Sequence, residues 1–287
     1  MSSNYTLNDY LNDYPVLNLK EVSYNVFRIK NRIIYEPCKK LKQAQRYIKK
    51  WVNKHYPLEL STHNSAKQHT GKKWVLKMDI KDFYGSVRYE YIQRIIQQTF
   101  YIYATEEIVN YLTDIVTVGK HLPVGAPTSA HIANACFLPL DKKIKEYSNR
   151  HDVEYSRYMD DMTFSCNNKN ILNSVEHYVS ELIQQFGFKL NEKKTRYISS
   201  NKQQNILGIV VNKEVRTPKE LRKKVRAMIH HYAISKGQYA PKDTDYTNFD
   251  QYDEIKLRGY INYIKSVDKK TYEQLEKYCQ KFRTKLF

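Results

Sequence analysis

The sequence predicts an α/β protein, in which a mixed (α+β) body is followed by a helical C-terminal part. Three observations predict this. Segments typical of strands occur near residues 26–36, 74–80 and 154–166. Longer segments with apolar residues at helical spacing lie between them. After Pro218 the pattern is helical to the end of the chain, and 287 residues can bury a substantial core.

The chain is strongly basic. It has 48 Lys and Arg against 30 Asp and Glu, which gives a net charge of +18. A protein this basic usually meets a polyanion, most commonly nucleic acid. The 26 tyrosines suit base stacking beside phosphate contacts. The alternative is a basic surface over a core that contains the tyrosines.

We expect a soluble, cytoplasmic protein that is not bound to a membrane. The four cysteines form no Cys-x-x-Cys pair, so neither zinc nor a disulfide framework is expected. The segment MSSNYTLNDYLNDYP lacks the basic and apolar regions of a signal peptide. The uncharged segment 121–140 is interrupted by three prolines and a glycine, so we do not expect it to span a membrane.

The N-terminal elements are predicted to be a pair of short strands and a basic helix. Residues 26–36 alternate as strands do and end at Pro37. From Leu41 the apolar residues fall at helical spacing. Nine basic residues and one acid, Glu36, lie between positions 28 and 50. Such a one-sided charge favours a surface that faces phosphates.

The remaining elements follow in order. We expect a buried strand at 74–80, helices at 89–117 and 131–150, paired strands at 154–158 and 162–166, a helix at about 170–186 and a strand-like segment at 205–217. The part from residue 216 onward is helical and carries 17 basic and 9 acidic residues. It therefore resembles a separate helical subdomain.

Three aspartates indicate the chemistry. Asp160 and Asp161 occupy the turn between two strands, where Asp is well tolerated, and Asp79 ends a buried strand. Carboxylates placed together repel one another unless divalent cations lie between them, and hard oxygen ligands suit Mg²⁺. Two Mg²⁺ ions roughly 3.5–4 Å apart stabilise the attacking and leaving oxygens of a phosphoryl transfer. Most isolated Asp-Asp pairs are ordinary turns, but the third Asp and the basic charge favour catalysis.

Five segments in sequence order resemble the motifs of reverse transcriptases. They are MDIKDFY at 78–84, LPVGAPTS at 122–129, YMDD at 158–161, GFKLNEKKT at 187–195 and ILG at 206–208. The basic segment RIIYEPCKKLK at 32–42 resembles the fingers of the same enzymes, so the resemblance spans nearly the whole chain. It implies a right-hand polymerase that copies RNA into DNA.

The resemblance also implies the domain organisation. Fingers and palm are interleaved over residues 1–215, and the palm core covers about 72–90 and 120–215. The palm is an antiparallel sheet that carries the YMDD hairpin. The helical thumb covers 216–287.

Within this superfamily, the chain resembles the bacterial retron branch. SAKQH at 65–69 is similar to a retron pattern of Asn-Ala-x-x-His, with Ser65 in place of Asn, and LRGYINYIKSVD at 257–268 is similar to the end of a retron thumb. Where a Val-Thr-Gly signature is usual, ILG keeps only Gly208. No nuclease, ribonuclease H or maturase extension is visible. The resemblance implies a structured noncoding RNA as template and primer, dNTPs as substrates, a branched RNA-linked DNA product, antiphage defence and a separate effector protein.

The resemblance assigns roles to the candidate active-site residues. Asp79 and Asp160 bridge two Mg²⁺ ions, Asp161 assists, and the backbone carbonyl of Ile80 completes one coordination sphere. Tyr84 is implied to be a steric gate that stacks under the sugar and excludes a 2′-hydroxyl.

Further residues are implied to bind nucleotide or RNA. Lys194 stabilises or protonates the leaving pyrophosphate, and the triphosphate contacts are Arg32 and Lys40. The tight backbone at the nucleotide is formed by Gly125 and Pro127, whereas Val124 and Ala130 depart from the residues common in relatives. The RNA-binding candidates are Asn64, His69, Arg222, Lys223, Arg226 and His230.

The first helix after Pro218 is the segment that we most expect to bind RNA. Its charges at 222, 226 and 230 fall on one helical face, while Val225, Met228 and Ile229 can pack against the body. Two alternatives to a retron enzyme stay open. One is another bacterial reverse transcriptase, of the abortive-infection, diversity-generating or untemplated type. The other is a non-catalytic RNA-binding scaffold.

Overall fold

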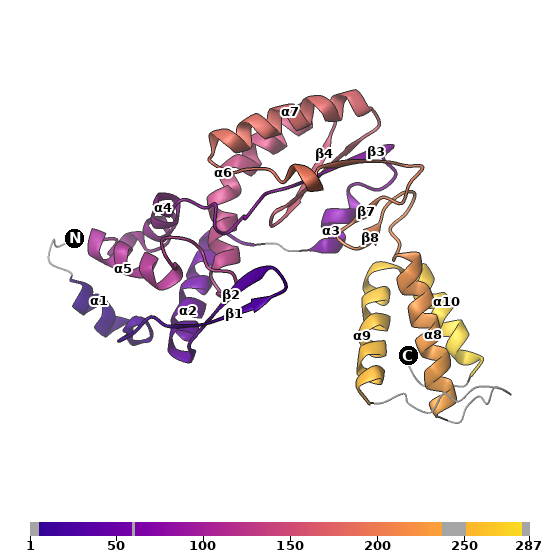
Figure 1. Ribbon diagram of the computed structural model, residues 1–287, viewed down its shortest axis with the longest axis horizontal. Coiled ribbons are helices and arrows are strands. Elements are labelled where there is room, and N and C mark those ends of the chain that lie inside the picture. The colour runs from indigo at the N-terminus through magenta and orange to yellow at the C-terminus, as the bar shows by residue number, and fades with distance from the viewer. Residues whose placement is uncertain (1–5, 59–60, 237–250, 283–287) are drawn as a thin grey trace. The chain divides into compact units, whose positions relative to one another are not determined.

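In the computed structural model, which describes residues 6–58, 61–236 and 251–282, the chain divides into two units (Figure 1). Unit 1 comprises Met1–Leu60, Leu76–Thr163 and Lys169–Arg196. Unit 2 comprises Ser61–Val75, Phe164–Asn168 and Tyr197–Phe287. The stretches 237–250 and 283–287 of the expected thumb lie outside the described residues.

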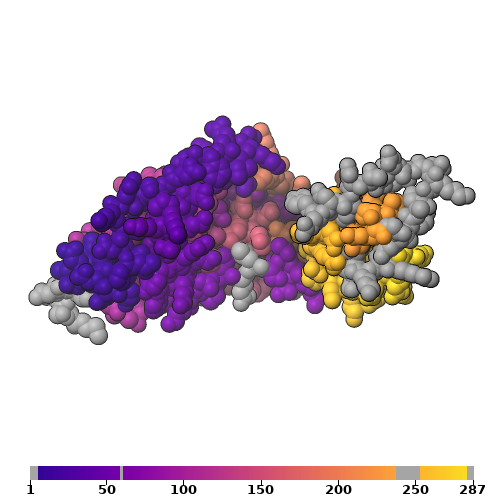
Figure 2. Space-filling model, turned by 90° about the horizontal axis from the view of Figure 1, so that it is seen from below, coloured from indigo at the N-terminus to yellow at the C-terminus, as the bar shows by residue number. Residues whose placement is uncertain are grey.

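Unit 1 begins with elements that form a continuous indigo surface in Figure 2. They are α1 (Leu7–Asp13), the 3₁₀ turn η1 (Pro15–Leu17), β1 (Tyr24–Ile29), β2 (Arg32–Pro37) and α2 (Lys39–His55). The predicted strand pair is present, with antiparallel register from Tyr24↔Pro37 to Ile29↔Arg32. Helix α1 was not predicted. It is short, and a capping box between Thr6 and Asp9 starts it.

The other helices of unit 1 are α4 (Tyr89–Thr99), the 3₁₀ turn η2 (Tyr101–Tyr103), α5 (Glu106–Val116), α6 (Ser129–Arg150) and α7 (Lys169–Gln185). The prediction of a single helix at 89–117 was wrong. The first helix ends at Phe100, and a second helix begins after Thr105, whose side chain accepts a hydrogen bond from the Ile108 amide. The long helix α6 contacts α2, α4, α7 and β4, as Figure 1 shows. It is the central support of unit 1.

A four-stranded sheet carries the predicted aspartates. Its strands are β3 (Trp74–Asp79), β4 (Glu154–Tyr158), β5 (Asp161–Cys166) and β6 (Arg196–Ser199), in the order β4–β5–β3–β6. The predicted hairpin is present as β4 and β5, joined by the two-residue turn Met159–Asp160. Because β5 and β3 are neighbours, Asp161 at the start of one lies on the sheet beside the strand that Asp79 ends.

Unit 2 contains a small β-hairpin and a helical bundle. Helix α3 (Thr62–Lys67) contacts the hairpin of β7 (Asn205–Ile206) and β8 (Ile209–Val210). The segment 205–217 is thus strand only at these four residues. The bundle consists of α8 (Lys219–Ser235), α9 (Gln251–Val267) and α10 (Lys269–Gln280), as predicted after Pro218.

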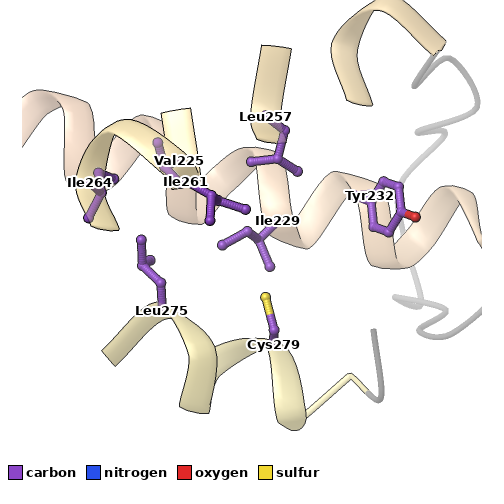
Figure 3. Close-up of a cluster of buried hydrophobic side chains, with 8 residues drawn as sticks. All are labelled: Val225, Ile229, Tyr232, Leu257, Ile261, Ile264, Leu275 and Cys279. Atoms are coloured by element: carbon purple, nitrogen blue, oxygen red, sulfur yellow. The ribbon is translucent and has the colours of Figure 1, made fainter. Parts of the chain in front are cut away.

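Apolar residues from all three bundle helices meet in its interior, as Figure 3 shows. Val225 and Ile229 of α8 are fully buried, as expected from their helical positions, and Met228 packs partly buried against the same core. Asp268 ties the start of α10 to the preceding chain, because its carboxylate accepts from the backbone amides of Thr217 and Thr271, each at 2.9 Å. Among the helices of the described residues, none combines the length and apolarity needed to cross a bilayer.

Candidate functional site

The candidate site lies in unit 1, where the end of β3 meets the β4–β5 turn. Asp79 is buried, and Asp160 and Asp161 are half-buried. The Ile80 amide donates to the Asp160 carbonyl at 3.0 Å, which fixes the turn against the end of β3. The structure therefore brings the three predicted aspartates to one place.

The carboxylates are close enough to affect one another. Burial raises the pKa of the Asp160 carboxyl, and the charges of Asp79 and Asp161 raise it further, whereas Lys194 lowers it. Since like charges at a half-buried position disfavour ionisation, this group gains from any cation that reaches it. The arrangement is a site of concentrated negative charge at the end of an apolar strand.

Two lysines supply positive charge at this site. Lys194 Nζ donates to Asp79 Oδ2 at 2.8 Å, and this hydrogen bond raises the pKa of the Lys194 ammonium. It is positioned by the 3₁₀ turn η3 (Glu192–Lys194). Lys77 Nζ lies 3.8 Å from Asp161 Oδ1. Sequence reasoning missed Lys77, although it precedes Asp79 by two residues and so shares a strand face with it.

The donor set fits divalent metal ions. Carboxylate oxygens are hard ligands, which divalent ions such as Mg²⁺ prefer. In this structure the Asp79 carboxylate already binds a cation, because the Lys194 ammonium lies 2.8 Å from it. Within the described part of the chain, no three His, Cys, Asp or Glu side chains converge into a ready ligand cage. Lys194 and Lys77 hold Asp79 and Asp161 in the present arrangement, so an ion would take the place of the Lys194 contact.

Of the predicted nucleotide-binding residues, Tyr84 lies within electrostatic reach of Asp160, and Arg32 lies within electrostatic reach of Tyr84. Tyr84 is half-buried in the turn region after β3, with its ring centroid 5.7 Å from that of Phe83. Burial raises the pKa of the Tyr84 hydroxyl, the charge of Asp160 raises it further, and Arg32 lowers it. Arg32 thus acts on Tyr84 from β2. Lys40 is exposed at the start of α2, and no hydrogen bond or ion pair within the described part of the chain joins it to the site.

The predicted tight backbone at Gly125 has a clear physical cause. Gly125 has φ +110°, and a Cβ there would lie 2.9 Å from both Ile34 Cγ2 and the Tyr35 carbonyl oxygen. The Tyr35 amide also donates to the Val124 carbonyl at 2.8 Å. The close approach that requires glycine is therefore to strand β2, and Pro127 lies half-buried in the same loop.

The predicted RNA-binding residues of α3 and its surroundings differ in exposure. Asn64 is exposed. His69 has no exposed surface, and its Nδ1 lies 2.7 Å from Ser165 Oγ. Burial lowers the pKa of His69 to about 3, so the ring is neutral. This placement does not allow His69 to contact RNA directly, and its role here is to pack against β5.

A basic groove of about 570 Å³ lies between α8 and α10 in unit 2. Six cations line it: Lys219, Arg222, Lys223, Arg226, Lys277 and Lys281. None of its described lining residues is acidic. The Arg226 guanidinium stacks on the Tyr278 ring at 4.5 Å, and within the described residues Arg222 Nε has no hydrogen-bond partner. A groove of this kind fits phosphate groups.

Two aromatic side chains of α8, Tyr232 and His230, do not line this groove. Tyr232 belongs to the bundle core, so it cannot stack on an unpaired base. The His230 ring packs edge-on against Phe282 at 5.6 Å and does not line the groove. Of the four residues predicted on this helix, three line the groove: Arg222, Lys223 and Arg226.

Comparison with known proteins adds to this geometry. Residues 21–211 match the family model described as reverse transcriptase (RNA-dependent DNA polymerase). The chain is 27% identical over 268 residues to the retron Mx65 reverse transcriptase of Myxococcus xanthus, covering 85% of this chain and 60% of that protein. It is 28% identical over 265 residues to the retron Ec86 reverse transcriptase of Escherichia coli, covering 88% and 77%. This chain thus spans less than two thirds of the Mx65 enzyme's own length.

Solved structures show a likeness of fold. The telomerase of Candida albicans, in complex with a fragment of telomeric RNA, aligns with a TM-score of 0.50 at 10% identity over 96% of this chain and 61% of that chain. A foamy viral protease–reverse transcriptase in complex with double-stranded DNA aligns with a TM-score of 0.50 at 15% identity, over 89% and 38%. These likenesses confirm the predicted α/β fold class.

Proposed function

The chain belongs to the reverse transcriptase family, since the family model matches residues 21–211, and on this premise we propose that it is an RNA-directed DNA polymerase of the retron type. The observation that carries the proposal is the meeting of Asp79, Asp160 and Asp161 at the end of β3, with Lys194 at 2.8 Å from Asp79. Polymerases of this family use divalent metal ions, and the hard oxygen ligands at this site suit them.

The aspartates would hold two Mg²⁺ ions. When bound, such ions neutralise charge on the attacking and leaving oxygens of a phosphoryl transfer. Asp79 and Asp160 would be the main carboxylate ligands, and Asp161 and the Ile80 carbonyl would add to them. The half-burial of Asp160 excludes water from one side of this charge, which strengthens its interaction with a cation.

Lys194 acts on the leaving group. The amine is an ammonium at neutral pH, since the ordinary lysine pKa of 10.5 lies far above 7, and the hydrogen bond to Asp79 raises this pKa further. Once released from Asp79, this ammonium can donate a proton or a hydrogen bond to the departing pyrophosphate.

The fingers residues and Tyr84 bind the incoming dNTP. Arg32 and Lys40 contact the triphosphate as cations, and the Tyr84 ring lies under the sugar, where it excludes a 2′-hydroxyl. Gly125 and Pro127 hold the loop against β2, so the nucleotide meets a fixed backbone.

RNA is the proposed template and primer. The basic groove of α8 and α10 supports this, because six cations without an acid suit a phosphate backbone. The relatives named retron reverse transcriptases support a structured noncoding RNA as the substrate and a branched RNA-linked DNA as the product. Antiphage defence and a separate effector protein belong to the same proposal.

Sequencing the nucleic acid that copurifies with the protein tests this proposal. We expect one structured RNA joined to a single-stranded DNA that is complementary to part of it. Treatment with a debranching enzyme should separate the two strands if a 2′-hydroxyl primed the synthesis. Copurified RNA without any complementary DNA would favour the non-catalytic scaffold. Complementary DNA without a branch would favour another bacterial reverse transcriptase.

A further inference from the structure

A buried arginine holds the turn that presents Asp160. Arg157 lies on β4, and only 6% of its side chain is exposed. Its Nη1 donates to the Met159 carbonyl at 3.0 Å. Its Nε donates to both carboxylate oxygens of Asp141, at 2.9 and 3.0 Å, and its Nη2 to Asp141 and, at 2.8 Å, to Asn134 Oδ1. One guanidinium thus joins helix α6 to the turn.

The turn needs such a restraint. Met159 has φ +57°, a left-handed conformation that is unfavourable for a residue other than glycine. The next residue, Asp160, is half-buried and lies near the like charges of Asp79 and Asp161. Backbone strain and charge repulsion therefore both act to move Asp160 away. The Met159 carbonyl belongs to the peptide bond before Asp160, so fixing this carbonyl fixes the direction of the Asp160 side chain.

Helix α6 is built to receive the guanidinium. Asn134, Phe137 and Asp141 are spaced i, i+3 and i+7, so they lie on one helical face. The Arg157 guanidinium stacks on the Phe137 ring at 4.5 Å, and the Tyr155 hydroxyl donates to Asp141 Oδ1 at 2.6 Å. Asp141 balances the charge of Arg157, so the pair adds little net charge beside the aspartates.

We propose that Arg157 is a positioning residue, which clamps the Met159 carbonyl and thereby keeps Asp160 in place beside Asp79. The inference rests on the proposed function, because it assigns Arg157 a purpose in catalysis. A side chain that only fastened β4 to α6 would need the pair with Asp141 alone. The bond from Nη1 to the Met159 carbonyl is the contact that reaches the active site. Only the planar fork of arginine can make both contacts at once.

The test is Arg157→Lys. Lysine keeps the charge and can pair with Asp141, but it cannot also hold the Met159 carbonyl. We expect kcat for dNTP addition on an RNA template to fall about tenfold or more, with KM for dNTP and RNA affinity changed less than about threefold. Mn²⁺ affinity, measured by the EPR signal of free Mn²⁺ without substrate, should weaken by about threefold or more.

Two further variants separate positioning from stability. Arg216→Lys alters a partly buried arginine of unit 2 that pairs with Asp268, so it should lower the melting temperature and leave Mn²⁺ affinity unchanged. Asn134→Ala removes one of the acceptors that orient the Arg157 guanidinium, so it should loosen the carbonyl clamp and give a smaller but measurable loss of kcat and Mn²⁺ affinity. If Arg157→Lys does not fold, Asn134→Ala decides, and wild-type kcat and Mn²⁺ affinity in this variant would then overturn the proposal.

Failure of this inference differs from failure of the proposed function. A lower melting temperature of Arg157→Lys with wild-type kcat and Mn²⁺ affinity would mean that Arg157 only stabilises the fold. A wild-type protein that makes no DNA would instead contradict the polymerase assignment, and a loss of Mn²⁺ affinity in Arg157→Lys would still support the clamp. A wild-type protein that binds no Mn²⁺ at all would overturn both.

Discussion

We propose that Tyr84 excludes a ribose 2′-hydroxyl from the active site. Its ring lies half-buried between Phe83 and the charge of Asp160. Replacing it with alanine opens the space that a ribose hydroxyl needs. We predict that Tyr84→Ala raises ribonucleotide incorporation relative to deoxynucleotide incorporation about tenfold, or about 1.4 kcal/mol of lost discrimination. The ratio of kcat/KM for the two nucleotides measures this.

Tyr84→Phe is the matched control, because it keeps the ring and removes only the hydroxyl. It should discriminate as the wild type does. Equal ratios for Tyr84→Ala and the wild type would mean that another side chain forms the gate.

His69 makes the stability of the protein depend on pH. Its folded pKa of about 3 lies below the ordinary value of 6.5, so the unfolded chain takes up a proton that the folded chain does not. The stabilisation is therefore complete above pH 6.5 and is lost as the pH falls below it. Between pH 7.5 and 5.5, the free energy of unfolding should fall by roughly 1.4 kcal/mol from this group.

Denaturant unfolding at pH 7.5 and 5.5 measures this effect. His69→Gln should be less stable than the wild type at pH 7.5 but should lose less on acidification. His121→Gln, at an exposed histidine, should keep the wild-type pH dependence. A wild-type pH dependence in His69→Gln would show that His69 is not the buried neutral group.

At the scale of elements, Gly125 fastens the 122–129 loop to β2. Gly125→Ala meets both a positive φ and two contacts at 2.9 Å, one of them to backbone. We predict a loss in free energy of unfolding of about 2–4 kcal/mol, since strain at φ > 0 and a steric shift add. It should also raise KM for dNTP, because we propose that the loop faces the nucleotide.

Gly71→Ala is the matched control. Gly71 has φ +78° but no atom within 4 Å of a Cβ, so it should show only the strain, about 1–2 kcal/mol. If both variants lose the same free energy of unfolding, strand β2 can move away from the added methyl group at little cost.

The groove of α8 and α10 predicts salt-dependent RNA binding. Arg222→Ala with Arg226→Ala should weaken RNA affinity and reduce the slope of log K against log salt by nearly one for each phosphate group that the variant no longer binds. Affinity should be measured at several salt concentrations, with the copurifying RNA and with an unrelated structured RNA. Stronger binding of the copurifying RNA is expected of a retron enzyme.

Arg258→Ala controls for net charge. Arg258 lies on α9, pairs with Glu254 and does not line the groove. Its removal should leave the salt slope close to that of the wild type. If Arg258→Ala and Arg222→Ala reduce the slope equally, general charge and not the groove binds the RNA.

The sequence predicted elements with a regular apolar pattern well, and it missed short helices and helix breaks that depend on capping residues. The strand pair at 24–37, the β4–β5 hairpin and the three C-terminal helices were visible because their apolar spacing is regular. Helices α1 and α3 are only seven and six residues long, so periodicity cannot identify them, and capping by Thr6 and Ser61 helps to start them. The break at 100–105 in the expected helix depends on Thr105 as a cap, a signal easily overlooked inside a periodic segment.

The sequence predicted the acidic residues of the candidate site better than the lysines that contact them. Asp79, Asp160 and Asp161 stood out because carboxylates are rare in apolar strands. The partner of Asp79 could not be read from periodicity, since Lys194 is 115 residues away along the chain. The placement of His69 and Tyr232 could not be predicted from the sequence, because both lie in polar segments but are buried in the folded protein.

Across the whole molecule, positive and negative charges are concentrated in different places. The net charge of +18 contrasts with the acidic cluster of Asp79, Asp160 and Asp161. Unit 2 places six cations in one groove, whereas unit 1 pairs its active-site acids with Lys194 and Lys77. A basic protein with a small acidic centre attracts nucleic acid and metal ions together.

We propose that Asp79, Asp160 and Asp161 catalyse RNA-templated DNA synthesis. The most direct measurement is incorporation of labelled dNTP on a primed RNA template in Mg²⁺, by the wild type and by Asp160→Asn with Asp161→Asn. Asparagine keeps the shape and removes the charge. We predict template-dependent synthesis by the wild type and a fall of about a hundredfold or more in the variant, at unchanged RNA affinity. Undiminished synthesis by the variant would contradict the account.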